Sequence, residues 1–272
     1  MNGQGGMGTD KDNDGNDPFE KLSYFMFGLN YLSNNVYLGR KDTALLPYIS
    51  PYIGYHDKNG LYAKAMSSYA PTQHVLDLFT IEAGYDHSFG EHLNAGANLN
   101  KFFYNKNSTS IRSSTKGSAS IYSQYTNDWI EPQVNFDANL NKKSTDYALG
   151  IQLDHNFSLA NKMLNIIPAA GMNSGTQHYY DEYFIARLTK NDKTLQVKKV
   201  VANANKFNAI DYEFNTKVTY RINKWLFTLT PTYAIPVSPA QITLPATKNL
   251  SERTEQEHLS NSFYVELDIC HR

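Results

Sequence analysis

The chain of 272 residues contains one cysteine, Cys270, and no run of 18 or more apolar residues. A lone thiol excludes an intrachain disulfide, a zinc ribbon and an iron–sulfur cluster. The lack of a long apolar run excludes a membrane-spanning helix. The charge is nearly balanced, with 25 Lys and Arg against 26 Asp and Glu, so the chain lacks the basic excess that nucleic-acid binding requires. The first residues also carry no basic stretch and no apolar segment, and we expect no signal peptide in this sequence.

Aromatic and small polar residues dominate what is present: 20 Tyr and 14 Phe accompany only 2 Trp. Apolar and polar residues alternate along many segments, as in a strand with one apolar face. The last segment is the clearest, with Phe263, Val265, Leu267 and Ile269 on one face and Tyr264, Glu266, Asp268 and Cys270 on the other. No segment shows a helical period of comparable strength. The composition and the alternation together predict a protein that is mostly β.

Twelve strands can be placed, and the connections between them alternate in length. Short turns are expected at 57–60, 88–92, 126–129, 157–162 and 221–224, and Asn59-Gly60 is a typical hairpin turn. The other connections are mostly long, the longest being 179–208 and 237–260. The predicted strands are 22–33, 46–56, 61–69, 76–88, 92–104, 117–126, 129–140, 144–157, 163–178, 209–221, 224–236 and 261–271. All short turns therefore lie at one end of the sheet and the long loops at the other.

This arrangement predicts an all-β, up-and-down antiparallel transmembrane β-barrel of about 12 strands, apolar outside and polar inside. Residues 22–272 would form the outer-membrane β-barrel, and residues 1–21 a flexible acidic N-terminal tail. An even strand number places both termini on the periplasmic side of the cell outer membrane. The alternative is a soluble sandwich or barrel, but the polar face would leave its core with many unsatisfied polar groups.

Four segments resemble a poorly characterised family of outer-membrane β-barrels from the Bacteroidota: Tyr37–Asp42, Leu61–Ala65, Ile81–Asp86 and Leu229–Pro236. The resemblance covers about 22–272 and implies the fold and the location, without naming an activity. Members of the family usually end in an aromatic residue, whereas this chain ends Cys270-His271-Arg272. The resemblance also implies a sugar-attachment site, because Asp42-Thr43-Ala44 matches the sequence these bacteria modify, with Thr43 as the modified residue.

The polar face of the predicted strands collects charged residues that we expect to face the lumen: Lys64, Glu82, Asp86, Glu131, Asp137, Asp154, Glu213, Lys217, Glu266 and Asp268. In a wet lumen these acids would favour cations. In a filled lumen they would pair in a hydrogen-bonded network. Twelve strands fall between filled and channel-forming barrels, and the inward-facing tyrosines at 48, 52, 62, 122 and 264 favour a plugged or very narrow lumen.

Two further motifs carry chemistry. Asp10, Asp12 and Asp14 resemble the start of a calcium loop, but the Glu expected at its twelfth position is replaced by Lys21. The alternative is a solvated acidic linker without a cofactor. His87 and His155 lie before short turns on the lipid-facing register, but no outward Ser accompanies either histidine as a lipase would require. We therefore expect no enzymatic activity.

Two functions stay open at this stage. The chain is either a structural or accessory subunit of a larger outer-membrane assembly, or a narrow, mildly cation-preferring diffusion channel for small solutes. The expected partners are outer-membrane lipids and other outer-membrane or periplasmic proteins, with no nucleic acid. The long loops 179–208 and 237–260 are candidates for partner binding, since loops on rigid barrels commonly carry function.

Overall fold

The structure is a computed structural model that describes residues 22–41, 44–191, 200–244 and 251–272. The calcium-loop candidates Asp10, Asp12 and Asp14, the candidate modification site Thr43 and the predicted N-terminal tail lie outside these residues. Within the described residues, no helix is long and apolar enough to cross a membrane.

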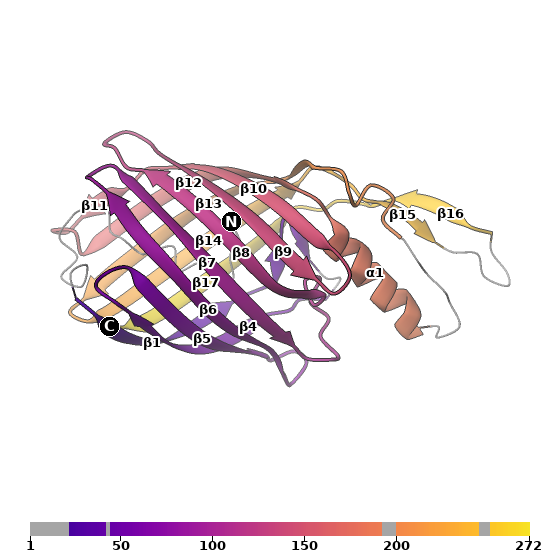
Figure 1. The fold of residues 1–272 in the computed structure, drawn as a ribbon, viewed down its shortest axis with the longest axis horizontal. Helices are drawn as coiled ribbons and strands as arrows, with labels where there is room; N and C mark the ends of the chain where they lie inside the picture. Colours follow the sequence, from indigo (N-terminus) through magenta and orange to yellow (C-terminus); the bar gives the residue numbers. More distant parts are fainter. Residues whose placement is uncertain (1–21, 42–43, 192–199, 245–250) are drawn as a thin grey trace.

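Twelve long antiparallel strands close into a barrel, as predicted (Figure 1). Each strand pairs with its neighbour in the chain, and β1 pairs with β17 to close the cylinder. The strands are β1 (Tyr24–Leu32), β4 (Tyr48–His56), β5 (Leu61–Ala70), β6 (Val75–Phe89), β7 (Leu93–Tyr104), β8 (Thr115–Tyr125), β9 (Glu131–Asn141), β10 (Thr145–Asp154), β12 (Leu164–Gly175), β13 (Asn208–Ile222), β14 (Trp225–Pro236) and β17 (Ser262–His271). The short strand β11 (Phe157–Leu159) continues β10 beside β12.

The outer wall of the barrel is apolar, which decides against the soluble alternative. Ile53, Ile81, Leu99 and Ile121 lie at mid-strand on β4, β6, β7 and β8 and are 46–65% exposed. Most of their sequence neighbours carry polar side chains and are less exposed, and Glu82, which follows Ile81, is fully buried. A soluble barrel would have the reverse distribution, whereas a barrel in lipid needs an apolar outside and tolerates a polar interior.

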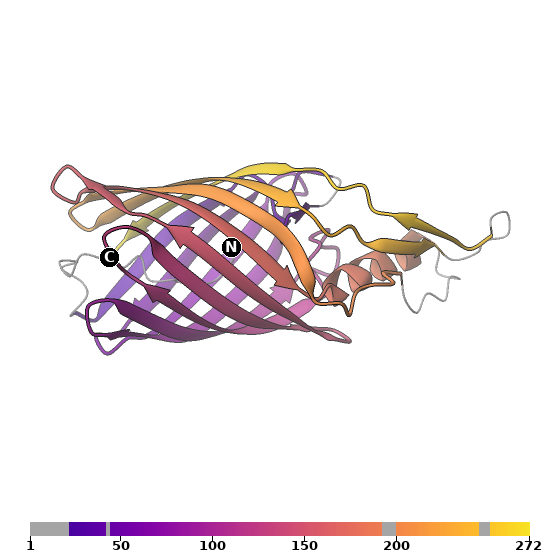
Figure 2. The ribbon, with the colours of Figure 1, turned by 90° about the horizontal axis from the view of Figure 1, so that it is seen from above.

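The two ends of the barrel differ. At the turn end, tight connections join the strands, and Gly60 takes a positive φ of 96° in the hairpin turn between β4 and β5. At the loop end, the connections carry the small hairpin β2 (Val36–Tyr37) and β3 (Arg40–Lys41), the helix α1 (His178–Asn191), and the hairpin β15 (Gln241–Leu244) and β16 (Arg253–Gln256). The helix and the β15–β16 hairpin extend beyond the barrel mouth (Figure 2).

The helix corrects the sequence prediction, which placed residues 179–208 in a loop. Residues 178–184 read His-Tyr-Tyr-Asp-Glu-Tyr-Phe, a poor composition for an isolated helix. Tertiary contacts at the barrel mouth stabilise it instead, as the next section describes.

Candidate functional site

The loop end of the lumen is filled with side chains. Every one of the twelve barrel strands contributes a fully or almost fully buried residue at this end. These residues are Leu32, Tyr48, Ala70, Leu78, Phe102, Thr115, Asn141, Ala148, Asn173, Asp211, Ala234 and Tyr264. Leu32, Tyr48, Ala70, Ala234 and Tyr264 form one apolar cluster across strands β1, β4, β5, β14 and β17. The interior is therefore packed here rather than lined by solvent.

The β2–β3 hairpin folds into the barrel mouth and completes this packing. Its turn residues Leu38 and Gly39 both have positive φ, 48° and 71°. A Cβ added at Gly39 would lie 2.9 Å from the Cβ of Asp211 and 3.1 Å from the Cβ of Pro236. Glycine is therefore favoured at position 39 for two reasons: the backbone is left-handed, and it lies close to Asp211 of β13 and Pro236 of β14. The hairpin acts as a stopper across the mouth.

Arg40, on the same hairpin, ties three loop segments together. Its guanidinium donates to the Glu257 carboxylate from Nε and Nη2, with a shortest distance of 3.1 Å, and to the Ser238 carbonyl at 2.6 Å. It also stacks over the ring of Tyr180, 4.8 Å from the centroid, while the Tyr180 hydroxyl donates to Glu257 at 2.6 Å. Burial alone lowers the pKa of Arg40, but Tyr179 and Glu257 raise it by more, so the pKa lies above its usual value. Arg40 is held as a cation.

An apolar cluster rich in tyrosine packs the stopper against the other loops; we call it the cap cluster. Its buried members come from four loop segments: Tyr37, Ile111, Tyr179, Tyr180, Tyr183, Val201, Ala204 and Ala240. The rings of Tyr37 and Tyr179 meet edge to face at 5.0 Å. The guanidinium of Arg112 lies 4.5 Å from the Tyr37 ring centroid and donates to the side chain of Asn139 at 2.9 Å. The cap cluster thus joins the loops to the barrel wall.

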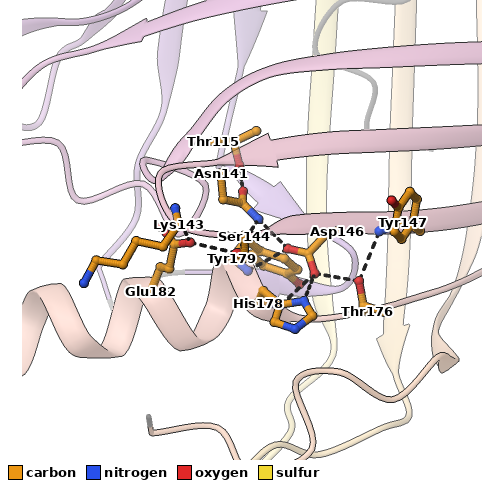
Figure 3. Close-up of polar contacts among 10 residues, drawn as sticks. All are labelled: Thr115, Asn141, Lys143, Ser144, Asp146, Tyr147, Thr176, His178, Tyr179 and Glu182. Carbon is orange, nitrogen blue, oxygen red and sulfur yellow. Dashed lines mark hydrogen bonds and ion pairs between the residues drawn. The ribbon is translucent and has the colours of Figure 1, made fainter. Parts of the chain in front are cut away.

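The N-terminus of α1 is anchored to the barrel wall by Asp146 of β10 (Figure 3). The Asp146 carboxylate accepts hydrogen bonds from the backbone N–H groups of His178 and Tyr179, both at 2.7 Å. It also accepts from the Asn141 amide at 2.7 Å, the Thr176 hydroxyl at 2.6 Å and His178 Nδ1 at 2.9 Å. Free N–H groups and the helix dipole both favour a carboxylate at a helix N-terminus. Here the barrel supplies the cap that the segment before the helix lacks.

Two further acids hold the helix and the segment that returns from it. The Glu182 carboxylate accepts from the Ser144 hydroxyl at 2.8 Å and the Lys143 amide at 3.0 Å in the β9–β10 connection (Figure 3). Asp181 accepts from the backbone amides of Val200 and Val201 at 2.6 and 2.7 Å. The first turn of α1 is therefore fixed on both sides.

The ten charged residues predicted to face the lumen are buried or half-buried, and many meet neutral donors. Lys64 Nζ lies 3.4 Å from Glu82, which also accepts from Tyr62 at 3.1 Å. The other carboxylates meet tyrosine or amide donors: Tyr122 with Asp86, Gln124 with Glu131, Asn135 with Asp137, Gln152 with Asp154, Tyr264 with Glu213, Asn30 with Glu266 and Tyr52 with Asp268. Lys217 is half-buried on β13. The contacts form local pairs along the barrel rather than one catalytic or metal-binding cluster.

Three buried carboxylates were not among the predicted residues. Asp146 and Asp211 lie on the inward register, just beyond the segments whose alternation was clear. The two-residue period of β6 predicts that Asp77 faces lipid. A β-bulge in β6 breaks this period, since the pairing with β5 shifts between Ser68 and Tyr69. The bulge turns Asp77 inward, where it accepts hydrogen bonds from Tyr48 and, at 2.8 Å, from Ser108. A simple two-residue period could not have shown this.

No protein-family profile matches the sequence. No curated protein matches it either. Among solved structures, the KdgM porin aligns over 91% of this chain and 98% of its own, with a TM-score of 0.51 and 10% identity. The KdgM porin in complex with disordered oligogalacturonate (TM-score 0.46, 11% identity, 92% and 99% covered) and the NanC porin (0.47, 9%, 92% and 100%) are less similar. Such identities concern the fold alone, so the resemblance to a Bacteroidota family stays a prediction. The chain has the fold of an outer-membrane β-barrel porin.

Proposed function

We propose that the protein is a structural or accessory barrel of a larger outer-membrane assembly. The observation that carries this proposal is the filled loop end, where all twelve strands bury a residue under the stopper and the cap cluster. A barrel built for free diffusion keeps an aqueous channel. The residues that fill this mouth instead stabilise a closed body, whose remaining surfaces are a lipid-facing wall and projecting loops.

The surfaces offered to a partner lie at the two ends of the barrel. Helix α1 and the β15–β16 hairpin extend past the mouth (Figures 1 and 2), and β16 is exposed along its whole length. Tyr24, the first residue of β1, and His271, the last residue of β17, lie at the turn end, since β1 and β17 pair there. We place this end in the periplasm and the projecting loops at the cell surface. Outer-membrane lipids and outer-membrane or periplasmic proteins are the proposed partners, and we assign the chain no reaction and no cofactor.

The test is gentle detergent extraction from native membranes, followed by native-gel sizing and mass spectrometry of co-migrating proteins. We expect a defined complex with stoichiometric partners. A matched pair of variants then locates the contact: Glu255→Lys on exposed β16 should weaken the complex, whereas Glu91→Lys at the opposite end should not. Migration near 30.8 kDa plus detergent would contradict the proposal.

A narrow, cation-preferring diffusion channel is the second candidate, favoured by the charge of the lumen. Among its inward-facing charged positions, Glu82, Asp86, Glu131, Asp137, Asp154, Glu213, Glu266 and Asp268 outnumber Lys64, Lys217 and Arg221. Carboxylates in a low-dielectric wall attract cations. Such a channel would conduct only after the stopper hairpin moves. Conductance of the purified protein in a planar bilayer tests it, and a conducting monomer would favour this second function over the first.

A further inference from the structure

The lipid-facing wall carries two lysines in its outer third, where an apolar surface is expected. Lys101 of β7 is exposed and pairs with Ile81 on one side and Gly117 on the other. Lys116 of β8 is also exposed and precedes Gly117, at the β-bulge between Thr115 and Gly117. Gly117, which faces Lys101 across the β7–β8 pair, has no side chain to cover either lysine.

The depth of these lysines matches a membrane interface. Lys101 lies eight residues beyond Leu93, the first residue of β7 at the turn end. In a strand tilted by about 40° this corresponds to roughly 20 Å along the barrel axis, near the far edge of an apolar band about 25 Å tall. The Lys101 ammonium leans further outward, lying 5.8 Å from the ring centroid of Phe103, two residues nearer the loop end. Its aliphatic stem therefore lies along the wall, and its charge lies beside Phe103 near the edge of the apolar band.

The rim above the pair adds positive charge and offers it no acidic partner. Lys106 and Lys142 are exposed in the β7–β8 and β9–β10 connections, and Asn141 pairs with Thr115 beside Lys116. None of these four lysines has an ion pair with a described residue. The carboxylates nearby are engaged elsewhere: Asp77 and Asp146 are buried, and Glu182 accepts from Ser144 and Lys143.

We propose that Lys101 and Lys116, with Lys106 and Lys142 above them, bind the phosphate group of a phosphorylated glycolipid in the outer leaflet. Lysines at the edge of an apolar band, without protein counter-charges, are suited to anionic lipid headgroups. The exposed apolar residues next to them, Phe103 and Leu140, would contact the acyl chains of the same lipid. The proposal rests on the placement of the long loops at the cell surface.

The experiment is native mass spectrometry of the full-length protein in a neutral detergent, titrated with diphosphoryl lipid A. The double variant Lys101→Gln/Lys116→Gln is compared with Lys58→Gln/Lys224→Gln, which removes the same charge from exposed residues at the turn end. We expect the first pair of substitutions to weaken lipid binding about tenfold and the second to leave it unchanged. Lipid A without its phosphates should bind the wild-type protein and the Lys101→Gln/Lys116→Gln variant equally weakly.

Three outcomes would overturn the proposal. The first is an equal loss of lipid A affinity in both double variants, and the second is that the wild type binds lipid A equally well with and without its phosphates. The third is displacement of lipid A by inorganic phosphate at matched phosphate concentration. The last result would indicate a site for free anions. Heat-modified gel mobility reports whether each variant forms a barrel. If the double variant does not, Lys101→Gln alone is compared with Lys101→Arg, which should keep the affinity. Because isolated protein is used, failure here is distinct from failure to find a protein complex.

Discussion

Replacing Asp146 by alanine should release helix α1 from the barrel mouth while leaving the barrel intact. The carboxylate is 2% exposed and accepts from five donors, two of which are the first N–H groups of the helix. Removing it leaves the helix N-terminus uncapped and the Asn141 and Thr176 side chains without this acceptor. The strands pair through their backbones, so their hydrogen bonds are not lost.

The magnitude follows from these contacts. Loss of a helix cap costs about 1 kcal/mol, and loss of a hydrogen bond to a buried charge costs about 1.5–3 kcal/mol. Since the five bonds share one carboxylate, they are not additive, and we expect about 2–3 kcal/mol for local opening of the helix. Amide hydrogen exchange in α1 should therefore accelerate about 30- to 150-fold, since each 1.4 kcal/mol is tenfold. Asp146→Asn, which keeps one acceptor oxygen, should fall between alanine and wild type.

Hydrogen exchange with mass spectrometry measures this opening separately in α1 and in the strands. The matched control is Asp128→Ala, which removes an exposed carboxylate in the β8–β9 turn at the other end of the barrel. Unchanged exchange in α1 would refute the capping argument. Acceleration spread over β9, β10 and β12 as well would show that Asp146 stabilises the wall rather than the helix.

Three further predictions concern the stopper and the lumen. Gly39→Ala should destabilise the β2–β3 hairpin by about 1–2 kcal/mol, because the φ of 71° at Gly39 and its 2.9 Å approach to Asp211 both oppose a Cβ. Amide hydrogen exchange in residues 36–41 measures this, and Gly90→Ala, with the same φ and no atom within 4 Å of the added Cβ, isolates the backbone contribution. Arg40→Met should leave the Glu257 carboxylate without its cation and destabilise the loop packing by about 2–4 kcal/mol. Faster proteolysis within 237–244 and 251–261 would show this, while Arg253→Met on exposed β16 should change nothing. If the barrel conducts once the stopper is loosened, Glu131→Gln should lower its cation preference, whereas Glu91→Gln, in the exposed β6–β7 turn, should not. Equal effects of both would show that the lumen does not select the ion.

The barrel could be predicted from the sequence because lipid enforces one rule on every strand. Positions that face lipid must be mostly apolar, so Phe263 to Ile269 and the other segments alternate, and the short turns alternate with long loops. The predicted bounds of β7, 92–104, differ by one residue from the observed Leu93–Tyr104. Where the rule is broken locally, as by the bulge at Asp77, the prediction failed by one register step.

The loop end could not be predicted, because its stabilising contacts join residues far apart in the sequence. The segment around α1 carries no capping residue at position 177, where a glutamine stands, and a string of aromatic residues follows. Asp146, 32 residues before His178, supplies the cap, and Arg40 on the first loop meets Glu257 on the last. No local sequence pattern around Asp146 or Arg40 indicates which distant residue it contacts.

This distribution of contacts bears on how the mouth could open. The stopper, the helix and the last loop share Arg40, Tyr180 and Glu257, so moving the hairpin breaks the ion pair and exposes the Tyr180 ring at the same time. Asp146, in contrast, anchors the N-terminus of α1 to strand β10 and forms no hydrogen bond with the stopper or the last loop in the described residues. Helix release and stopper release are therefore separable: Asp146→Ala should speed exchange in α1 more than in residues 36–41, and Arg40→Met should do the reverse. Equal acceleration of both segments in both variants would mean that the mouth opens as one cooperative unit.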